Sequence, residues 1–504
     1  MKLKQKLEQL GAQPDLILII TDEQRATQHF PPGWEEENLP TLTFLKQNGF
    51  SFDRAFCNTC MCSPSRTTLF TGVYPAKHGV TQTLTEGGLL SPGEPTLNTS
   101  LPNIMNVLWG EGYDVQYRGK WHMSKGVAPN GTKTNYDDLA AADISLFGAM
   151  GWVAPDAGED VNPLNFGGGY ANHDAKYTAE AIKYLKEVRV RRAAGDHQPY
   201  CLILSLVNPH DVLAYPKTAA TSGYHPSSWS GRDIKLPGTF GEELLRNKKP
   251  MAQEQILIGM GASLGELTTL EQNLDYINFY GYLLSYVDKE IGYFIDELYR
   301  EGKDGKKLAD SAIVTMTSDH GEMGLAHGGL RQKTFVAYEE ALRVPLVISN
   351  PVVFKDHGLK QSMALATLVD IMPTFIELAN VSNPPTGLAG TSLLPIIEDG
   401  TPVQESILFT FDDTKAGSNS QLSAVKAANR IRCIRTEKWK FDIYFDALGT
   451  YYNQYELYNL EEDPSEYTNL AYDPEYKDIR DELERQLHQL EIAKLRVNTP
   501  SDVS

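Results

Sequence analysis

Four stretches of the chain are almost continuously apolar and are too short for long helices. They are residues 15–21, 200–207, 311–317 and 344–349. Continuous apolar runs of this length are typical of strands buried on both faces of a sheet. Other stretches carry apolar residues at helical spacing, at residues 40–47, 100–111, 175–190 and 273–300. This alternation predicts an α/β domain in which helices cover both faces of a large, mostly parallel sheet.

The pattern changes twice along the chain. Residues 124–172 are rich in Gly, Pro, Asn and Asp and lack periodicity, which predicts a long insertion over the active face. Beyond residue 400, short strand-like segments at 407–411, 430–435 and 440–445 precede a charged helix at 478–495. We therefore expect a large α/β domain over residues 1–400 and a small α+β domain with an antiparallel sheet over residues 401–504.

The chain is acidic, with 65 acidic and 46 basic residues and a formal net charge of −19. This charge argues against nucleic acid or an anionic membrane as a partner, and its simplest interpretation is solubility. The N-terminal residues 1–13 are polar, and no apolar run is long enough for a signal peptide or a membrane span. We therefore expect a cytoplasmic protein.

The five cysteines are an odd number and make a poor disulfide framework. One of them begins the run Cys62-Ser63-Pro64-Ser65-Arg66. Ser63 suits a helix N-cap and Pro64 suits the first helical turn, so Cys62 is predicted at the positive end of a helix. Arg66, one turn on, adds positive charge. A cysteine in that place is expected to have a lowered pKa and to be reactive.

Acidic residues follow two of the predicted strands. Asp22 and Glu23 end the first strand, and Asp319 and His320 follow the strand at 311–317. The carboxyl ends of parallel strands are where open α/β sheets build their sites, and paired carboxylates there suit a hard divalent cation. A solvated turn explains the first pair equally well when it is considered alone.

Basic residues occupy comparable places. Lys120 and His122 follow a short predicted strand at 113–117, His210 follows the strand at 200–207, and Lys333 comes shortly after Asp319. A surface lysine or a packed histidine is the alternative reading of each.

Several of these motifs together resemble the type I sulfatases of the alkaline phosphatase superfamily, with an arylsulfatase-like pattern. The resemblance rests on Cys62-x-Pro64-Ser65-Arg66, on the Leu-Phe-Thr-Gly at 69–72, and on Tyr74-Pro75 followed by His78-Gly79. Later segments at 369–374, 390–395 and 456–464 also look like landmarks of this family. The resemblance implies an alkaline-phosphatase-like fold.

The resemblance also implies a mechanism. In this family a maturation enzyme oxidises the cysteine to formylglycine, and the hydrated aldehyde attacks sulfur. A divalent metal, Ca²⁺ first and Mn²⁺ or Mg²⁺ as alternatives, would be held by a set of five residues: Asp22, Glu23, Cys62, Asp319 and His320. Glu23 stands where the family usually has a second Asp. Arg66 would hold the hydrated aldehyde and the metal cluster in position. The sulfate and leaving group would be handled by Lys120, His122, His210 and Lys333.

The predicted function is hydrolysis of sulfate monoesters, of an aryl or other small sulfated substrate. A phosphonate monoester or phosphodiester hydrolase of the same superfamily is the close alternative, and a non-catalytic binder of sulfated ligands is a further one. Trp152, Tyr170 and Asn172 of the insertion, with His173, are candidates for shaping the substrate pocket. The helix at 478–495 is a candidate contact for a homo-oligomer.

Overall fold

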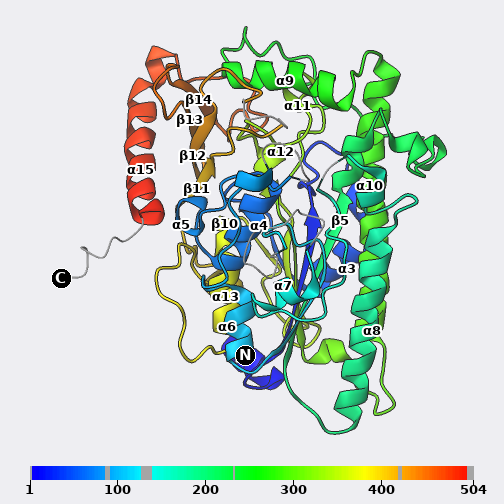
Figure 1. Ribbon diagram of the computed structural model, residues 1–504. Coiled ribbons are helices and arrows are strands. Elements are labelled where there is room, and N and C mark those ends of the chain that lie inside the picture. The colour runs from blue at the N-terminus through cyan, green and yellow to red at the C-terminus, as the bar shows by residue number, and fades with distance from the viewer. Residues whose placement is uncertain are drawn as a thin grey trace.

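The centre of the computed structural model is a seven-stranded sheet in the order β4-β5-β1-β6-β8-β2-β9 (Figure 1). The structure describes residues 3–85, 91–126, 139–159, 161–230, 233–417 and 423–496. The strands are β1 (Asp15–Asp22), β2 (Gly49–Phe52), β4 (Asp114–Gly119), β5 (Tyr200–Pro209), β6 (Ala312–Ser318), β8 (Leu346–Ser349) and β9 (Gln361–Ser362). Strands β4, β5, β1 and β6 run parallel, whereas β8 is antiparallel to β6 and to β2.

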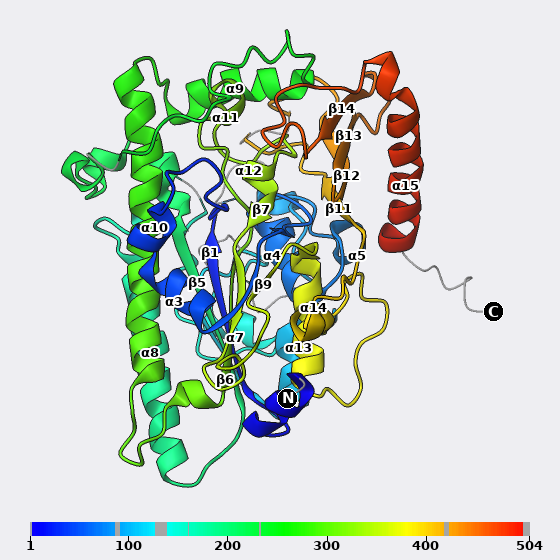
Figure 2. The ribbon, with the colours of Figure 1, turned by 180° about the vertical axis from the view of Figure 1, so that it is seen from behind.

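Helices cover both faces of this sheet (Figure 2). On one face lie α3 (Pro40–Gln47), α8 (His173–Ala193) and α10 (Leu270–Tyr299), and on the other lie α4 (Cys62–Thr71), α6 (Ile104–Gly110) and α13 (Ile371–Leu378). Strand β1 supplies side chains to both cores. Leu16, Leu18 and Ile20 belong to the core beneath α4, and Ile17 and Ile19 belong to the core beneath α10. This explains why the strand is continuously apolar in sequence.

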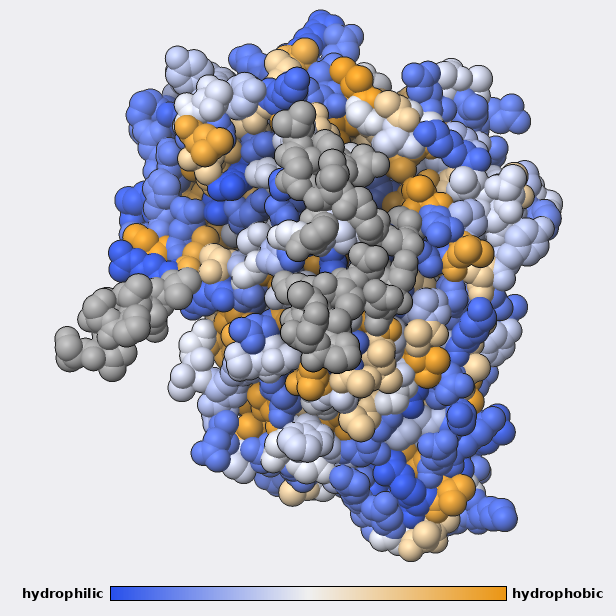
Figure 3. Space-filling model, viewed as in Figure 1, coloured by the Kyte–Doolittle hydropathy of each residue, from blue (hydrophilic) through white to orange (hydrophobic). Residues whose placement is uncertain are grey.

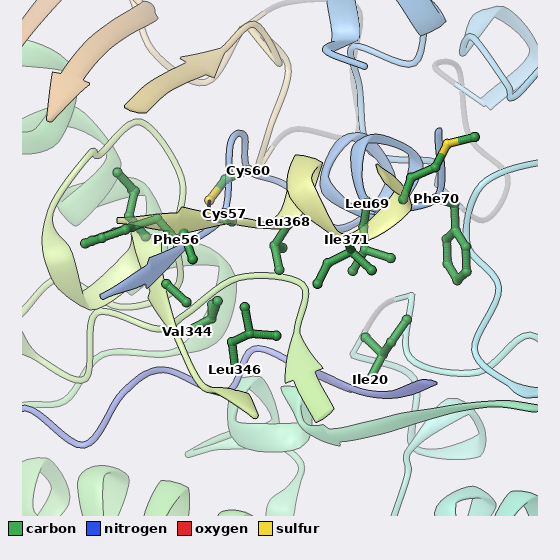
Figure 4. Close-up of a cluster of buried hydrophobic side chains, with 14 of the residues drawn as sticks. Ile20, Phe56, Cys57, Cys60, Leu69, Phe70, Val344, Leu346, Leu368 and Ile371 are labelled. Carbon is green, nitrogen blue, oxygen red and sulfur yellow. Dashed lines mark hydrogen bonds between the residues drawn. The ribbon is translucent and has the colours of Figure 1, made fainter. Parts of the chain in front are cut away.

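Figure 4 shows part of the core beneath α4. Leu69 and Phe70 of α4 lie with Ile20 of β1, Leu346 of β8 and Ile371 of α13, and all of these side chains are buried. Every residue of α4 is buried. Its N-terminus is therefore fixed relative to the ends of the sheet strands, which lets the protein place a reactive group there.

The predicted strand at 344–349 is in fact two strands. Arg343–Val344 forms β7, which joins β3 (Ala55–Phe56) and β10 (Ala366–Thr367) in a small sheet, and β8 continues the large sheet. Pro345 separates them because proline has no backbone N–H to give to a ladder. The other three predicted strands and the four predicted helices are confirmed, with shifted ends: the helix expected at 100–111 begins only at Ile104, where Asn103 caps it.

The C-terminal sheet is antiparallel, in the order β11-β12-β13-β14. Its strands are β11 (Ser406–Phe411), β12 (Arg430–Thr436), β13 (Trp439–Phe445) and β14 (Gln454–Asn459), and α15 (Lys477–Leu495) packs against it (Figure 1). The first three strands and the helix were predicted, whereas β14 was not recognised as a strand. The domain boundary at residue 400 stays a prediction.

Short helices connect these elements: α1 (Leu3–Leu7), α2 (Trp34–Asn38), α5 (Pro75–His78), α7 (Ala141–Ser145), α9 (Met251–Leu264), α11 (Ala326–Gly329), α12 (Glu339–Leu342) and α14 (Leu394–Asp399). Within the described residues, no helix combines the length and the apolarity needed to cross a membrane. On the face drawn in Figure 3, hydrophobic residues form scattered groups among hydrophilic ones. Residues 127–138 and 160 of the predicted insertion lie outside the described residues.

Candidate active site

The predicted site residues meet where the carboxyl ends of the parallel strands reach the N-terminus of α4. Asp22 is the last residue of β1, and Asp319 directly follows β6. The register pairs Thr21 with Ser318, and the Asp319 backbone N–H donates to the Thr21 carbonyl at 3.2 Å. Pairing of β1 with β6 therefore brings together two carboxylates that are far apart in sequence.

Four potential metal ligands converge at this point. One atom each of Asp22, Cys62, Asp319 and His320 lies within 4.8 Å of the others, and all four residues are buried. His320 Nε2 lies 3.2 Å from Cys62 Sγ and 3.6 Å from Asp319 Oδ1. Cys62 Sγ lies 3.7 Å from Asp22 Oδ1. Hard divalent cations bind carboxylate oxygens and tolerate an imidazole nitrogen as a ligand. This set of side chains therefore fits the predicted metal.

Glu23 is placed differently from the other predicted ligands. Its φ is 71°, and its backbone N–H donates to Asp319 Oδ1 at 3.1 Å. One carboxylate oxygen accepts from Lys333 Nζ at 3.1 Å, and the other, Oε1, is buried without a hydrogen-bond partner among the described residues. Glu23 belongs to a second group of convergent ligand atoms, with Asp22 and His210. Burial raises the pKa of its carboxyl group well above the ordinary value.

Arg66 bridges the carboxylates of Asp22 and Asp319. Its Nε donates to Asp319 Oδ2 at 2.8 Å, and its Nη2 donates to Asp22 Oδ2 at 3.0 Å. The remaining nitrogen, Nη1, donates to Ser205 Oγ at 2.7 Å and to the Lys120 carbonyl at 3.1 Å. A guanidinium with its donors in a rigid fork suits this bridging role. Arg66 thus fixes both carboxylates of the predicted metal cluster, as the family resemblance implies.

Two lysines bring positive charge to the site. Lys120 Nζ lies 2.6 Å from Asp22 Oδ2, and Lys333 contacts Glu23. Burial acts to lower the pKa of Lys120, but Asp22 and Cys62 outweigh burial and hold it above its ordinary value. Burial likewise acts to raise the pKa of Asp22, but Lys120, His210 and Arg66 hold it well below its ordinary value. These charges therefore stabilise one another in a buried site.

Both predicted histidines are buried beside these charges. Burial, followed by the charge of Lys120, holds the pKa of His122 and that of His210 well below the usual value, so both are neutral. His122 Nε2 donates to the Leu84 carbonyl at 2.9 Å. His210 Nδ1 is buried and has no hydrogen-bond partner among the described residues.

Two expectations about Cys62 are wrong. Helix α4 begins at Cys62 itself with Met61 as the N-cap, and the Ser63 hydroxyl accepts from the Leu84 N–H and does not cap the helix. The pKa of the Cys62 thiol is raised to about 11, first by burial and then by the charge of Asp22. Burial disfavours the thiolate more than the helix terminus and the lysines favour it. The unmodified cysteine is therefore not an activated thiol.

The aromatic residues proposed to shape the pocket have other positions. Trp152 is buried, and its indole N–H donates to the Gly119 carbonyl at 2.9 Å. Tyr170 is 76% exposed. Asn172 accepts a hydrogen bond from the Tyr286 hydroxyl, and His173 Nε2 lies 2.8 Å from the Leu164 carbonyl. Trp152 is therefore part of the core beneath α4, where its large apolar ring is buried.

Comparisons with known proteins agree with this geometry. A family model described as Sulfatase matches residues 14–381, and one described as N-sulphoglucosamine sulphohydrolase, C-terminal, matches residues 327–493. Arylsulfatase K of Mus musculus is 24% identical over 509 residues, which cover 97% of this chain and 81% of the mouse protein.

Two solved structures share the fold. One, determined in complex with its substrate D-glucosamine-2-N,6-O-disulfate, has a TM-score of 0.69 and 20% identity and covers 98% of this chain and 100% of its own. The other is the phosphonate monoester hydrolase of Agrobacterium radiobacter, with a TM-score of 0.67 and 21% identity, covering 95% of this chain and 96% of its own. Because the sulfatase model spans most of the sequence, this chain belongs to the sulfatase family: it is a type I sulfatase with the fold of the alkaline phosphatase superfamily and a sulfuric ester hydrolase.

Proposed function

We propose that this sulfatase hydrolyses sulfate monoesters with Cys62 matured to formylglycine and with a divalent cation held by Asp22, Asp319 and His320. The observation that carries the proposal is the convergence of these ligand atoms on position 62, at the start of a wholly buried helix. Glu23 is a further candidate ligand through its free Oε1. We expect Ca²⁺ first, with Mn²⁺ and Mg²⁺ as alternatives.

Two groups supply chemistry that the side chains lack. A formylglycine supplies a hydrated aldehyde as an oxygen nucleophile, and the cation supplies positive charge beside the sulfate oxygens. The chain itself orients them. Arg66 holds both aspartates, and the start of α4 presents position 62 between them.

The basic residues have separate tasks in this proposal. Lys120 and Lys333 place fixed positive charge at the sulfate, which stabilises negative charge that develops as the S–O bond breaks. His122 and His210 are neutral in the buried site, so each can accept a proton. His210 Nδ1 is free to bond a substrate, and we assign His210 or Lys333 to the leaving oxygen.

Sulfated sugars are the substrates to test first, beside a simple aryl sulfate. The support is that a solved protein of the same fold binds D-glucosamine-2-N,6-O-disulfate as its substrate. A phosphonate monoester hydrolase also shares this fold, so the fold alone does not separate the two reactions. Lys120 favours the sulfatase reaction because it holds a fixed positive charge beside Asp22 and Cys62.

The test combines mass spectrometry of the Cys62 peptide with rates on an aryl sulfate and an aryl phosphonate monoester. We expect an aldehyde at position 62, faster turnover of the sulfate, and a stoichiometric divalent metal by elemental analysis. The Cys62→Ala variant should lose activity, whereas Cys201→Ala, which changes another buried cysteine, should keep it. Faster phosphonate turnover would favour the alternative enzyme. Unmodified Cys62 in a host that carries the maturation enzyme, with binding of sulfated ligands but no turnover, would favour the non-catalytic binder.

A further inference from the structure

The turn that follows β4 carries two of the basic side chains of the site. Lys120 and His122 lie two residues apart, and both are buried. His122 has φ of 51°, a left-handed conformation that a non-glycine residue adopts only when its surroundings impose it. At Gly119, which precedes the turn, a Cβ atom would lie 1.8 Å from the Ser205 carbonyl oxygen. The turn therefore packs tightly on β5, and its conformation needs support from outside.

Asp156 of the insertion provides that support. Its Oδ1 accepts from the Trp121 backbone N–H at 2.6 Å, and its Oδ2 accepts from the His122 backbone N–H at 2.8 Å. Asp156 is 6% exposed. Hydrogen bonds from backbone N–H groups to a buried carboxylate are strong, and the two bonds together fix the direction of two successive peptide units.

The same segment contacts the turn at two further points. The Trp152 indole N–H donates to the Gly119 carbonyl at 2.9 Å, and Lys120 Nζ donates to the Gly158 carbonyl. The segment is itself anchored on α8, because the Tyr177 hydroxyl donates to the Pro155 carbonyl at 2.6 Å. Residues 152–158 thus hold the backbone on both sides of Lys120 and also the lysine ammonium group.

We propose that Asp156 is a positioning residue of the sulfatase reaction, which fixes the turn that presents Lys120 and His122 to Asp22 and Cys62. The proposal rests on the proposed function, because it assigns these two side chains to the sulfate. Asp156 acts through the turn, because its carboxylate bonds the backbone N–H groups of Trp121 and His122. This role would connect the predicted insertion at residues 124–172 to catalysis.

The protein contains a matched control for Asp156. Asp288 of α10 also bonds two successive backbone N–H groups, those of Thr41 and Leu42, each at 2.9 Å. It is 2% exposed and holds the start of α3 on the opposite side of the sheet from α4. Asp156→Asn and Asp288→Asn therefore remove the same kind of interaction at and away from the site. An asparagine keeps the size of the side chain but can accept only through one oxygen.

The experiment compares these two variants, and Asp156→Ala where it folds, with the wild-type holoenzyme. Aldehyde content at position 62 is measured in each, so that lost maturation is not mistaken for lost positioning. We expect kcat/KM of Asp156→Asn to fall by about 10²-fold, the loss typical of a catalytic group misplaced by about 1 Å. Affinity for inorganic sulfate should fall at least several-fold. Asp288→Asn should show a similar fall in Tm with kcat/KM within about twofold of wild type.

Equal activity of the two variants at equal aldehyde content would overturn the proposal. If the wild-type enzyme turns over no sulfate ester, the proposed function fails. Binding of inorganic sulfate then tests whether Asp156 positions the turn. Weakened sulfate binding in Asp156→Asn alone supports positioning of the turn, and unchanged binding overturns it. Amide hydrogen exchange at Trp121 and His122, slow in wild type and fast in the variant, adds a readout without activity.

Discussion

Two clusters of buried charged side chains in the described part of this sulfatase can be compared. The site cluster consists of Asp22, Glu23, Arg66, Lys120, Asp319, His320 and Lys333. The interface cluster consists of Glu242, Lys249, His327, Glu339, Arg435, Lys440, Glu456 and Glu466, and it joins the large domain to the C-terminal sheet. All of these residues are buried. Burial of charge alone therefore does not distinguish the site cluster from the interface cluster, to which no reaction is assigned.

The two clusters differ in how their carboxylates are arranged. In the interface cluster Lys440 pairs with Glu466, Lys249 pairs with Glu242 at 3.3 Å, and the Tyr338 hydroxyl donates to Glu456 at 2.9 Å. Two groups of three or more ligand atoms converge closely enough to hold a metal ion among the described residues. Both groups include Asp22 of the site cluster. The carboxylates of both clusters are paired with cationic side chains, but those of the site cluster also converge with other ligand atoms, and this convergence indicates function.

The largest expected effect comes from the shared residue of the site cluster. Asp22→Asn removes a proposed metal ligand, the ion pair with Lys120 and one of the two carboxylates that Arg66 pairs with, so we expect kcat to fall by at least about 10³-fold. Asp15→Asn is the control at the opposite end of β1, where Asp15 is buried and pairs with Arg192 at 2.7 Å. It should cost stability but not activity. Comparable activity in both variants would remove the distinction between the clusters.

The interface cluster should respond in stability and not in rate. Lys440→Met leaves the Glu466 carboxylate buried without its cation, and breaking a buried pair from one side costs about 3–5 kcal/mol. Denaturant unfolding measures this loss. kcat per folded molecule should stay within about twofold of wild type. A large fall in kcat with little change in stability would show that the interface cluster also serves the reaction.

The pH dependence of stability sharpens the comparison further. Burial raises the pKa of Glu466 from 4.5 to about 7, despite the attraction of Lys440. Between these values the folded state holds a proton that the unfolded state has lost, so this group lowers stability as pH rises from about 4.5 to 7 and has no further effect above. Glu466→Gln should remove this contribution, at most about 1.4 kcal/mol for each pH unit. The measurement is the unfolding free energy of wild type and Glu466→Gln at pH 5, 6 and 7. The same dependence on pH in both proteins would refute the prediction.

An exposed pair gives the baseline for both clusters. Lys477 and Asp481 of α15 form an i, i+4 ion pair in which the lysine side chain is 62% exposed. Solvent and salt screen such pairs, so Lys477→Met should change the unfolding free energy by less than about 0.5 kcal/mol. A change as large as that of Lys440→Met would mean that burial is not what separates these pairs.

Much of the site could be predicted from short segments of sequence. Asp22 and Asp319 each end a continuous apolar run, and the ends of parallel strands meet at one edge of a sheet. Contacts between distant segments could not be predicted. The segment around Asp156 has no periodicity, and Ser205 lies inside a buried strand where nothing distinguishes a site residue. The raised pKa of Cys62 follows from burial that only the whole fold creates. The interruption of the strand at 344–349 is predictable from Pro345, which has no N–H for a ladder.

The long separation of the two halves of the site has a consequence for synthesis. The Ser65 hydroxyl of α4 donates to the Asp319 carbonyl, across 254 residues of chain. A ribosome that adds about 5–20 residues per second takes about 13–50 seconds to cover that distance. During this interval Asp319 and His320 cannot cover Cys62, which ends 2% exposed in the finished molecule. In the proposed function, a maturation enzyme would have a limited time to reach the thiol, and slower translation between these segments should raise the fraction of molecules with formylglycine at position 62.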